Sequence, residues 1–389
     1  MSRIARKYFR PIICPSAVFS VVQQALLVLV PLYILEIGGS MAESAMIIGV
    51  KGLGMMLTDV PAGMLLSRIG VKRMMLAGIS LFVLSIALMA SVPLMPVLVL
   101  AAVLQGIAHS AWLVGRIAYI SECTEVDERG RVMALSAGMI RIGNMMGPLL
   151  AGVLIAFAGY EKTLYLFAVT SLLVILFVLL WVDPPGVEQS ESHKLAGLRT
   201  ALKDNRHSFL TAGGGVVALM LVRSSRTLML PLIGAALALD EASIGVAISI
   251  GAAVDTLLFY PAGTLMDRVG RKPIFIVSLS MLGVGIFMLP LIDSLAGLVL
   301  ISVLMGIGNG ISAGVVMTMG ADLAPCINRG NFIGVWRLLS DVGSTSGPMI
   351  IGGVLKVASL TMVSHLIGVL GVVGALYVAR TVTETHQRN

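Results

Sequence analysis

Charged residues are scarce in this chain. Only 12% of its 389 residues are Asp, Glu, Lys or Arg, whereas 57% are hydrophobic and the mean hydropathy is +0.98. Soluble globular proteins carry about 25% charged residues. The shortage of charge excludes an ordinary soluble domain and indicates a membrane protein that crosses the bilayer several times.

Cysteine is also rare, and each of the three cysteines lies close to a basic connection between apolar runs: Cys14, Cys123 and Cys326. We expect these connections to face the cytoplasm, where thiols stay reduced, so the sequence predicts free cysteines and no disulfide. A cleavable signal peptide is not expected, because the first apolar run is too long and no small-residue cleavage site follows it.

Sequences that serve common enzyme chemistries are missing as well. The chain has no Walker phosphate-binding sequence and no HExxH, and the glycine-flanked segment 343–347 has Thr rather than Ser at its centre. An ATP-driven pump and an intramembrane enzyme are therefore disfavoured. We expect no enzymatic activity, no cofactor and no metal.

Long apolar runs are abundant. A run of about 18 to 25 apolar residues can cross a bilayer as an α-helix, so the sequence predicts an all-α membrane protein. Twelve such runs lie near 12–37, 44–66, 74–92, 97–121, 132–157, 163–182, 209–236, 243–266, 274–291, 296–320, 331–356 and 361–379.

The connections between these runs alternate in charge. Those at 38–43 and 293–295 are short and have no Lys or Arg, whereas those at 67–73, 122–131 and 267–272 are basic. Basic loops stay on the cytoplasmic side, so both termini are predicted to be cytoplasmic. The same rule accounts for the net charge of +7 without a nucleic-acid partner.

The chain contains an internal repeat. Segment 261–272 matches segment 61–72 in register, and Gly106 recurs as Gly306 at the same offset. Both copies begin inside, so they are parallel repeats of six helices each. The predicted domains are an N-terminal bundle at 1–183, a cytoplasmic linker at 184–208 and a C-terminal bundle at 209–389.

The repeated loop resembles the first signature of the major facilitator superfamily, and the resemblance extends over essentially the whole chain. Segment 143–152 on the fifth helix is similar to the signature of the family's efflux antiporters, and segment 343–352 repeats its pattern. The resemblance implies a twelve-helix, proton-coupled exporter of the drug and metabolite branch, with a link to multidrug resistance. Ser67 replaces the usual acid of the first loop.

One position departs from the efflux pattern. Gln105-Gly106 is present on the fourth helix, but Ala102 occupies the place where efflux members carry Arg. The usual proton-relay assignment therefore cannot be transferred. The first helix also lacks an acid in its middle and offers Gln23 and Gln24, which can bind a substrate but cannot carry a proton.

The loop and fifth-helix motifs are candidate gating elements. Glycines let helices approach closely, proline bends a helix, and Asp267 can accept hydrogen bonds from the amides at a neighbouring helix N-terminus. The alternatives are a plain tight turn and passive packing. The candidate gating residues are Gly63, Arg68, Gly70, Gly143, Gly147, Pro148, Gly263, Asp267, Arg268, Gly270, Arg271, Gly343, Gly347 and Pro348.

Charges inside predicted helices are costly in lipid and usually mark a transport pathway. Using the family arrangement, we predict two ion pairs between the halves, Arg141–Asp255 and Asp59–Arg337, with Asp341 sharing Arg337 one turn away. A carboxylate released from its Arg can take up a proton, and Asp255 is the best candidate carrier. Alternatively, the pairs only hold the halves together.

An excess of buried Arg favours an anionic group on the substrate. Arg223 and Arg226 are the central cations, and the alternative is that they cap backbone carbonyls beside Pro231 or bind lipid headgroups. The candidate substrate-binding residues are Gln23, Gln24, Arg116, Arg223, Arg226, Trp112 and Asn309.

The sequence therefore predicts a monomeric, multi-pass secondary transporter of a bacterial-type inner membrane, which exports small amphipathic or anionic compounds in exchange for protons. Uptake or exchange of an organic anion, and lipid flipping, remain alternatives on the same fold.

Overall fold

The computed structural model describes residues 7–182, 202–325 and 329–385. Helices dominate these ranges, and no strand occurs in them. The chain divides into two compact units: unit 1 comprises 1–40 and 47–192, and unit 2 comprises 41–46 and 193–389. Each unit is described by itself.

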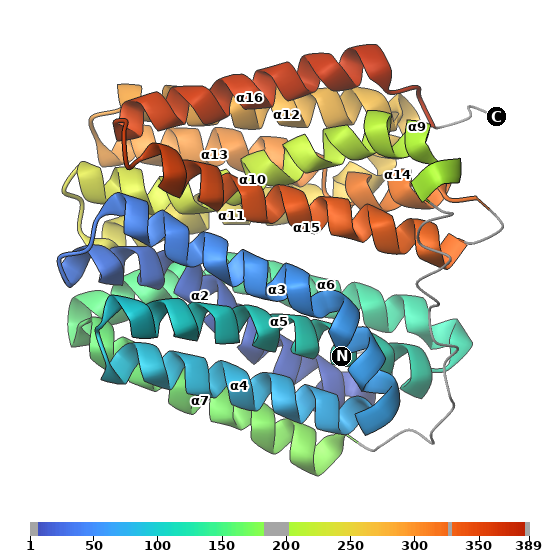
Figure 1. The fold of residues 1–389 in the computed structure, drawn as a ribbon, viewed down its shortest axis with the longest axis horizontal. Coiled ribbons are helices and arrows are strands. Elements are labelled where there is room, and N and C mark those ends of the chain that lie inside the picture. Colours follow the sequence, from blue (N-terminus) through green and yellow to red (C-terminus); the bar gives the residue numbers. More distant parts are fainter. Residues whose placement is uncertain (1–6, 183–201, 326–328, 386–389) are drawn as a thin grey trace. The chain divides into compact units, whose positions relative to one another are not determined.

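Unit 1 is a bundle that follows the first six predicted segments. α2 packs along α6, and α4 lies beside both α5 and α7 (Figure 1). Its helices are η1 (Phe9–Ile13), α2 (Cys14–Glu36), α3 (Met41–Ile69), α4 (Val71–Ser91), α5 (Met95–Cys123), α6 (Val126–Ala158) and α7 (Tyr160–Trp181).

Unit 2 repeats this packing. α10 packs along α15, and α12 lies beside both α13 and α16 (Figure 1). Its elements are α9 (Arg206–Ser208), η2 (Phe209–Gly213), α10 (Gly214–Ala236), α11 (Glu241–Val269), α12 (Arg271–Met288), η3 (Leu289–Leu291), α13 (Leu295–Ile311), α14 (Val315–Leu323), α15 (Arg329–Val354) and α16 (Leu360–Thr381).

The internal repeat extends to individual helix contacts. A Cβ atom on Gly106 of α5 would collide with the carbonyl oxygen of Lys51 in α3. At the twin positions, a Cβ on Gly306 of α13 would collide with the carbonyl oxygen of Gly251 in α11. Glycine is required at both crossings because the two backbones touch there.

The tenth predicted segment, 296–320, is not one helix. It divides into α13 and α14, with Gly314 at φ +96° between them. An apolar run continues through the break, which is why the hydropathy pattern did not predict it. The twin segment in unit 1 stays continuous through Val114 as α5.

Eleven helices of the described chain are long and apolar enough to cross a membrane, so this is a multi-pass membrane protein. The segment predicted at 331–356 forms α15, which is not among the eleven and carries Arg337, Asp341 and several hydroxyl side chains. The count of twelve spans therefore stays a prediction.

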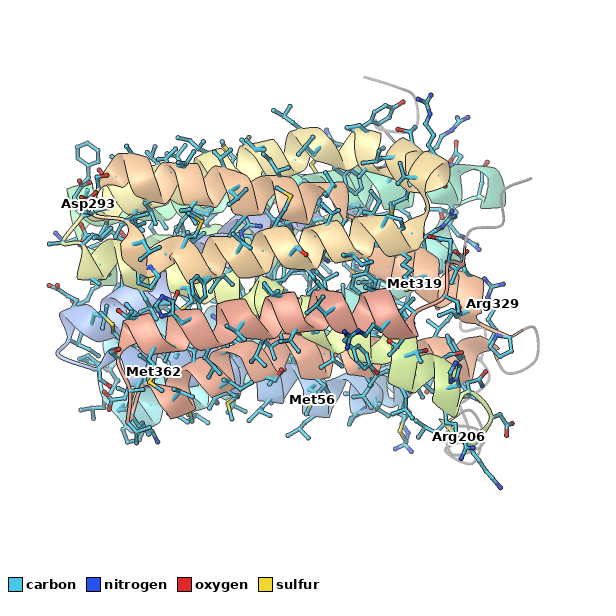
Figure 2. All side chains as sticks on the ribbon, turned by 90° about the horizontal axis from the view of Figure 1, so that it is seen from above. Met56, Arg206, Asp293, Met319, Arg329 and Met362 are labelled. Atoms are coloured by element: carbon cyan, nitrogen blue, oxygen red, sulfur yellow. The ribbon has the colours of Figure 1, made fainter. Side chains whose placement is uncertain are left out.

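Within unit 2 the connections between helices lie in two groups, one at each end of the bundle. Asp293 and Met362 lie toward one end of the unit, and Arg206 and Arg329 lie toward the other (Figure 2). This separation matches the predicted alternation between connections that lack Lys and Arg and connections that are basic. Cys326 and most of the predicted linker lie outside the described residues, whereas Cys14 and Cys123 are not joined in a disulfide.

Candidate functional site

Asp255 is the central buried carboxylate of unit 2. It lies on α11 and is only 3% exposed. Asn309 of α13 donates from Nδ2 to Asp255 Oδ2 at 2.6 Å, and Arg226 Nη1 of α10 lies 4.0 Å from the same oxygen. Three helices thus place a cation and an amide donor on one carboxylate, which offsets the cost of burying its charge.

Arg223 lies one turn before Arg226 on α10. Its Nη2 donates to the carbonyl oxygen of Ser312 at 3.1 Å and to Ser312 Oγ at 2.6 Å. Ser278 Oγ of α12 shares a hydrogen bond with Ser312 Oγ at 2.7 Å. Arg223 therefore satisfies a backbone group at the break between α13 and α14. The sequence-based alternative expected such a carbonyl beside Pro231, whereas the carbonyl contacted is that of Ser312.

Three further predicted charges contact neighbours within their own unit. On α15, Arg337 Nε lies 4.0 Å from Asp341 Oδ2, one helical turn away. In unit 1, Ser110 of α5 donates a short hydrogen bond to Asp59 of α3. The predicted pairs Arg141–Asp255 and Asp59–Arg337 each join one residue of unit 1 to one of unit 2, and they stay predictions.

The interior of unit 1 contains a polar stripe along α5. Gln105, His109, Trp112 and Arg116 follow one another at intervals of four, three and four residues, so they share one face of the helix. Phe19 of α2 covers the middle of this face, with its ring centroid 4.9 Å from Trp112 and 5.9 Å from His109.

Several buried polar atoms of unit 1 have no hydrogen-bond partner among the described groups. Four of them are donors on α3 and α5, which is unusual because buried donors are nearly always paired. The atoms are Lys51 Nζ, Gln105 Nε2, Trp112 Nε1 and Arg116 Nε, together with the acceptors Gln23 Oε1 on α2 and Asn144 Oδ1 on α6. Gln24, another predicted site residue, lies against Gly147 of α6.

The loop motif of unit 2 is an ionic cluster. Arg271 Nη2 lies 3.5 Å from Asp267, and Arg271 Nε lies 3.2 Å from Asp322. At the start of α12, Glu384 accepts from the backbone N–H groups of Arg271 at 2.9 Å and Lys272 at 3.1 Å. The predicted acceptance by Asp267 at a neighbouring helix N-terminus stays a prediction.

The loop of unit 1 lacks this cluster, because Ser67 and Val71 stand at the twin positions of Asp267 and Arg271. Its Lys72 instead donates to the carbonyl oxygen of Leu179 at 2.9 Å. Both loops turn at a glycine with positive φ, +79° at Gly70 and +104° at Gly270.

Not every motif glycine serves a close approach. A Cβ on Gly63 or Gly263 would meet no described atom within 4 Å, so no close contact requires glycine at these two positions in this structure. Their gating role stays a prediction. Arg68 and Arg268, which follow five residues later in the same helices, are exposed.

The glycines of α6 and α15 do pack closely. A Cβ on Gly143 would lie 2.7 Å from the backbone of Ser20, and one on Gly147 would lie 2.7 Å from the backbone nitrogen of Ala25. Gly343 and Gly347 approach α10 in the same way. Pro148 and Pro348 lie inside their helices, directly after these contacts.

A family comparison now decides the class of protein. The sequence profile of the Major Facilitator Superfamily matches residues 13–222 and, in a second match, 211–389. The chain belongs to this superfamily. The named relatives and the fold neighbours described below are transporters.

Named relatives are distant. The synaptic vesicular amine transporter of Mus musculus is 26% identical over 334 residues, which is 84% of this chain and 63% of the relative. The chain thus spans less than two thirds of that relative's length. An uncharacterised MFS-type transporter of Mycobacterium tuberculosis is 25% identical over 363 residues, covering 88% of this chain and 85% of the relative.

Solved structures share the fold. The nucleoside transporter NupG superposes with a TM-score of 0.79 at 16% identity, over 97% of this chain and all of that one. A POT family transporter in complex with a peptide conjugate gives a TM-score of 0.78 at 12% identity, over 96% and 94% of the two chains. At this identity the likeness concerns the fold alone.

Proposed function

We propose that this protein is a secondary active transporter that exports small amphipathic or anionic organic compounds across an inner membrane in exchange for protons. Transport proceeds by alternating access, in which the two six-helix repeats rock around a central site. Asp255 carries the proposal, because a buried carboxylate inside a membrane-spanning helix is expensive and usually serves transport.

The contacts of Asp255 suit a proton carrier. Arg226 and Asn309 stabilise the ionised carboxylate while they remain in place. A movement of α10 or α13 that withdraws them leaves a desolvated carboxylate, which then binds a proton. Proton binding and helix movement are thereby coupled. The names of the amine transporters among the relatives describe those proteins and not this one. The substrate class proposed here is therefore argued from the residues of this chain.

Exchange of an organic anion without protons is the second candidate. It is favoured by Ala102 at the position of the efflux arginine and by the unpaired donors of unit 1. In that mechanism Asp255 only stabilises the packing of α10, α11 and α13.

The test uses purified protein in liposomes that contain a pH-sensitive dye. After a pH gradient is imposed, substrates that are exported in exchange for protons change the dye signal in wild type, and Asp255→Asn removes at least nine tenths of this signal. Asp293→Asn, the same change at an exposed loop position, keeps it. Substrate movement that is unaltered in Asp255→Asn, or that occurs without proton flux, contradicts proton coupling and favours anion exchange.

A further inference from the structure

Lys51 is the most unusual cation of unit 1. It lies in the first half of α3, a helix long and apolar enough to span a membrane, and is 8% exposed. Its Nζ has no hydrogen-bond partner among the described groups. Buried ammonium groups are almost always paired, because an unpaired charge in a medium of low dielectric is costly. The side chain therefore calls for an explanation beyond folding.

Helix packing does not require a lysine at this position. The backbone crossing between α3 and α5 at Lys51 and Gly106 recurs in unit 2 between Gly251 and Gly306. At that twin crossing the residue has no side chain at all. Since the same crossing forms with glycine, the ammonium group of Lys51 is not needed to build it.

The neighbouring donor also has no hydrogen-bond partner in the described part of the chain. Gln105 precedes Gly106, so it lies at the level of Lys51 along the bundle, and its Nε2 is buried and unpaired in a side chain that is 2% exposed. The twin of Gln105 is Met305, which has no donor. At this level unit 1 thus presents an ammonium group and an amide donor that have no hydrogen-bond partner among the described groups. Unit 2 has Gly251 and Met305 at the twin positions and presents there only neutral hydroxyls without a described partner, those of Ser249 and Ser302.

We propose that Lys51 and Gln105 form a subsite for an anionic group, a carboxylate, on the transported compound. The ammonium group supplies charge and Gln105 supplies a directed hydrogen bond. Trp112 lies about two turns after Gln105 on α5, and the ring of Phe19 on α2 stacks against it. These two rings offer an apolar surface to the rest of an amphipathic molecule. This inference rests on the proposed transport function and specifies its substrate class.

The test is binding to detergent-purified, full-length protein, measured as a ligand-dependent rise in unfolding temperature. The probes are a panel of small aromatic and aliphatic carboxylic acids, each with its amide and its amine, beginning with indole-3-acetate, indole-3-acetamide and tryptamine. Acids are expected to bind more tightly than their amides and amines. Lys51→Met weakens acid binding at least tenfold while amide binding stays within about threefold, because a charge-assisted hydrogen bond contributes roughly a factor of ten or more.

Three variants separate binding from folding. Lys51→Met without ligand unfolds at the same temperature as wild type or higher, because an unpaired buried charge has been removed. Lys51→Arg keeps the preference for acids, and Lys162→Met, the same change at an exposed position, behaves as wild type. Gln105→Leu weakens acid binding about tenfold, because it removes one hydrogen bond from a neutral donor to the ionised carboxylate.

Several outcomes overturn the proposal: no acid of the panel binds, amines bind better than their acids, or the acid preference survives in Lys51→Met. If the liposome assay described under Proposed function shows transport of an amine or amide, and no acid binds to the purified protein, the anion subsite is refuted and the transporter proposal stands. If acids bind as expected but no compound of the panel is transported, the anion subsite stands and the transporter proposal is refuted.

Discussion

Lys51 in unit 1 and Arg226 in unit 2 are both buried cations inside a membrane-spanning helix, but their surroundings differ. Arg226 has the Asp255 carboxylate 4.0 Å away, and Asn309 completes that contact. Lys51 Nζ has no described hydrogen-bond partner. The repeat places comparable helices in both units, so the difference lies in side chains and not in the fold. It indicates that unit 2 uses its cation within the protein, whereas unit 1 leaves one for a ligand.

The largest expected effect comes from removing the cation of unit 2. Arg226→Leu introduces the residue found at the twin position, Leu26, and leaves Asp255 buried without its cation. Breaking a buried pair costs about 3–5 kcal/mol, so the variant should unfold at a clearly lower temperature than wild type in detergent.

The double variant Arg226→Leu/Asp255→Leu is the control for this prediction. It removes both charges and should recover most of the lost stability. The comparison fails if Arg226→Leu is as stable as Lys51→Met, since both cations would then be energetically alike.

A smaller effect is expected at the break between α13 and α14. Gly314 has φ +96°, and an alanine in this left-handed region costs about 1–2 kcal/mol. Gly314→Ala should therefore lower the unfolding temperature, although the added methyl group meets only Met266 Cε, at 3.7 Å.

Gly334→Ala is the matched control, because Gly334 lies inside α15 with open space around it. Alanine there should stabilise the protein by about 0.5–1 kcal/mol. Equal effects of the two substitutions would show that the break is not set by the backbone conformation of Gly314.

The smallest effect concerns the start of α11. Asp240 accepts from Ser243 N at 2.8 Å and from Ser243 Oγ at 2.6 Å, and these hydrogen bonds lower its pKa. Asp240→Ala should cost about 1 kcal/mol near pH 7. Because the folded-state pKa lies below the ordinary value of about 3.9, the contribution is present above that pH and is lost as the pH falls through the folded-state pKa.

Asp240→Ser introduces the residue of the twin position, Ser40, and tests the same cap without a titrating group. It should keep most of the stability and lose the acid dependence. Denaturation at a series of pH values measures both. An unchanged acid dependence in Asp240→Ser would assign it to other carboxylates.

Much of the helical architecture could be predicted from apolar runs, because lipid demands long helices and the repeat supplies each segment twice. The break at Gly314 could not, since glycine occurs freely inside the other helices and the run stays apolar. The contact of Arg226 with Asp255 was also missed. Sequence spacing does not show that a residue of α10 contacts a residue of α11, and the family arrangement predicts ion pairs between the two repeats instead.

The sequence alone singles out Lys51 as a cation that could extend the positive field of the buried Arg residues. Comparing twin positions shows a lysine where the other repeat has glycine, and such a difference within a membrane helix is a functional clue. The sequence alone could not show that Lys51 Nζ and Gln105 Nε2 have no hydrogen-bond partner among the described residues, because this depends on how the helices pack.

The most direct test of the account compares binding of one acid probe to Asp255→Asn and Lys51→Met under identical conditions. If unit 1 binds the substrate and unit 2 carries the proton, Asp255→Asn binds the acid within about threefold of wild type and Lys51→Met binds it at least tenfold more weakly. Equal losses in both variants, or a loss confined to Asp255→Asn, would contradict this division between the two units.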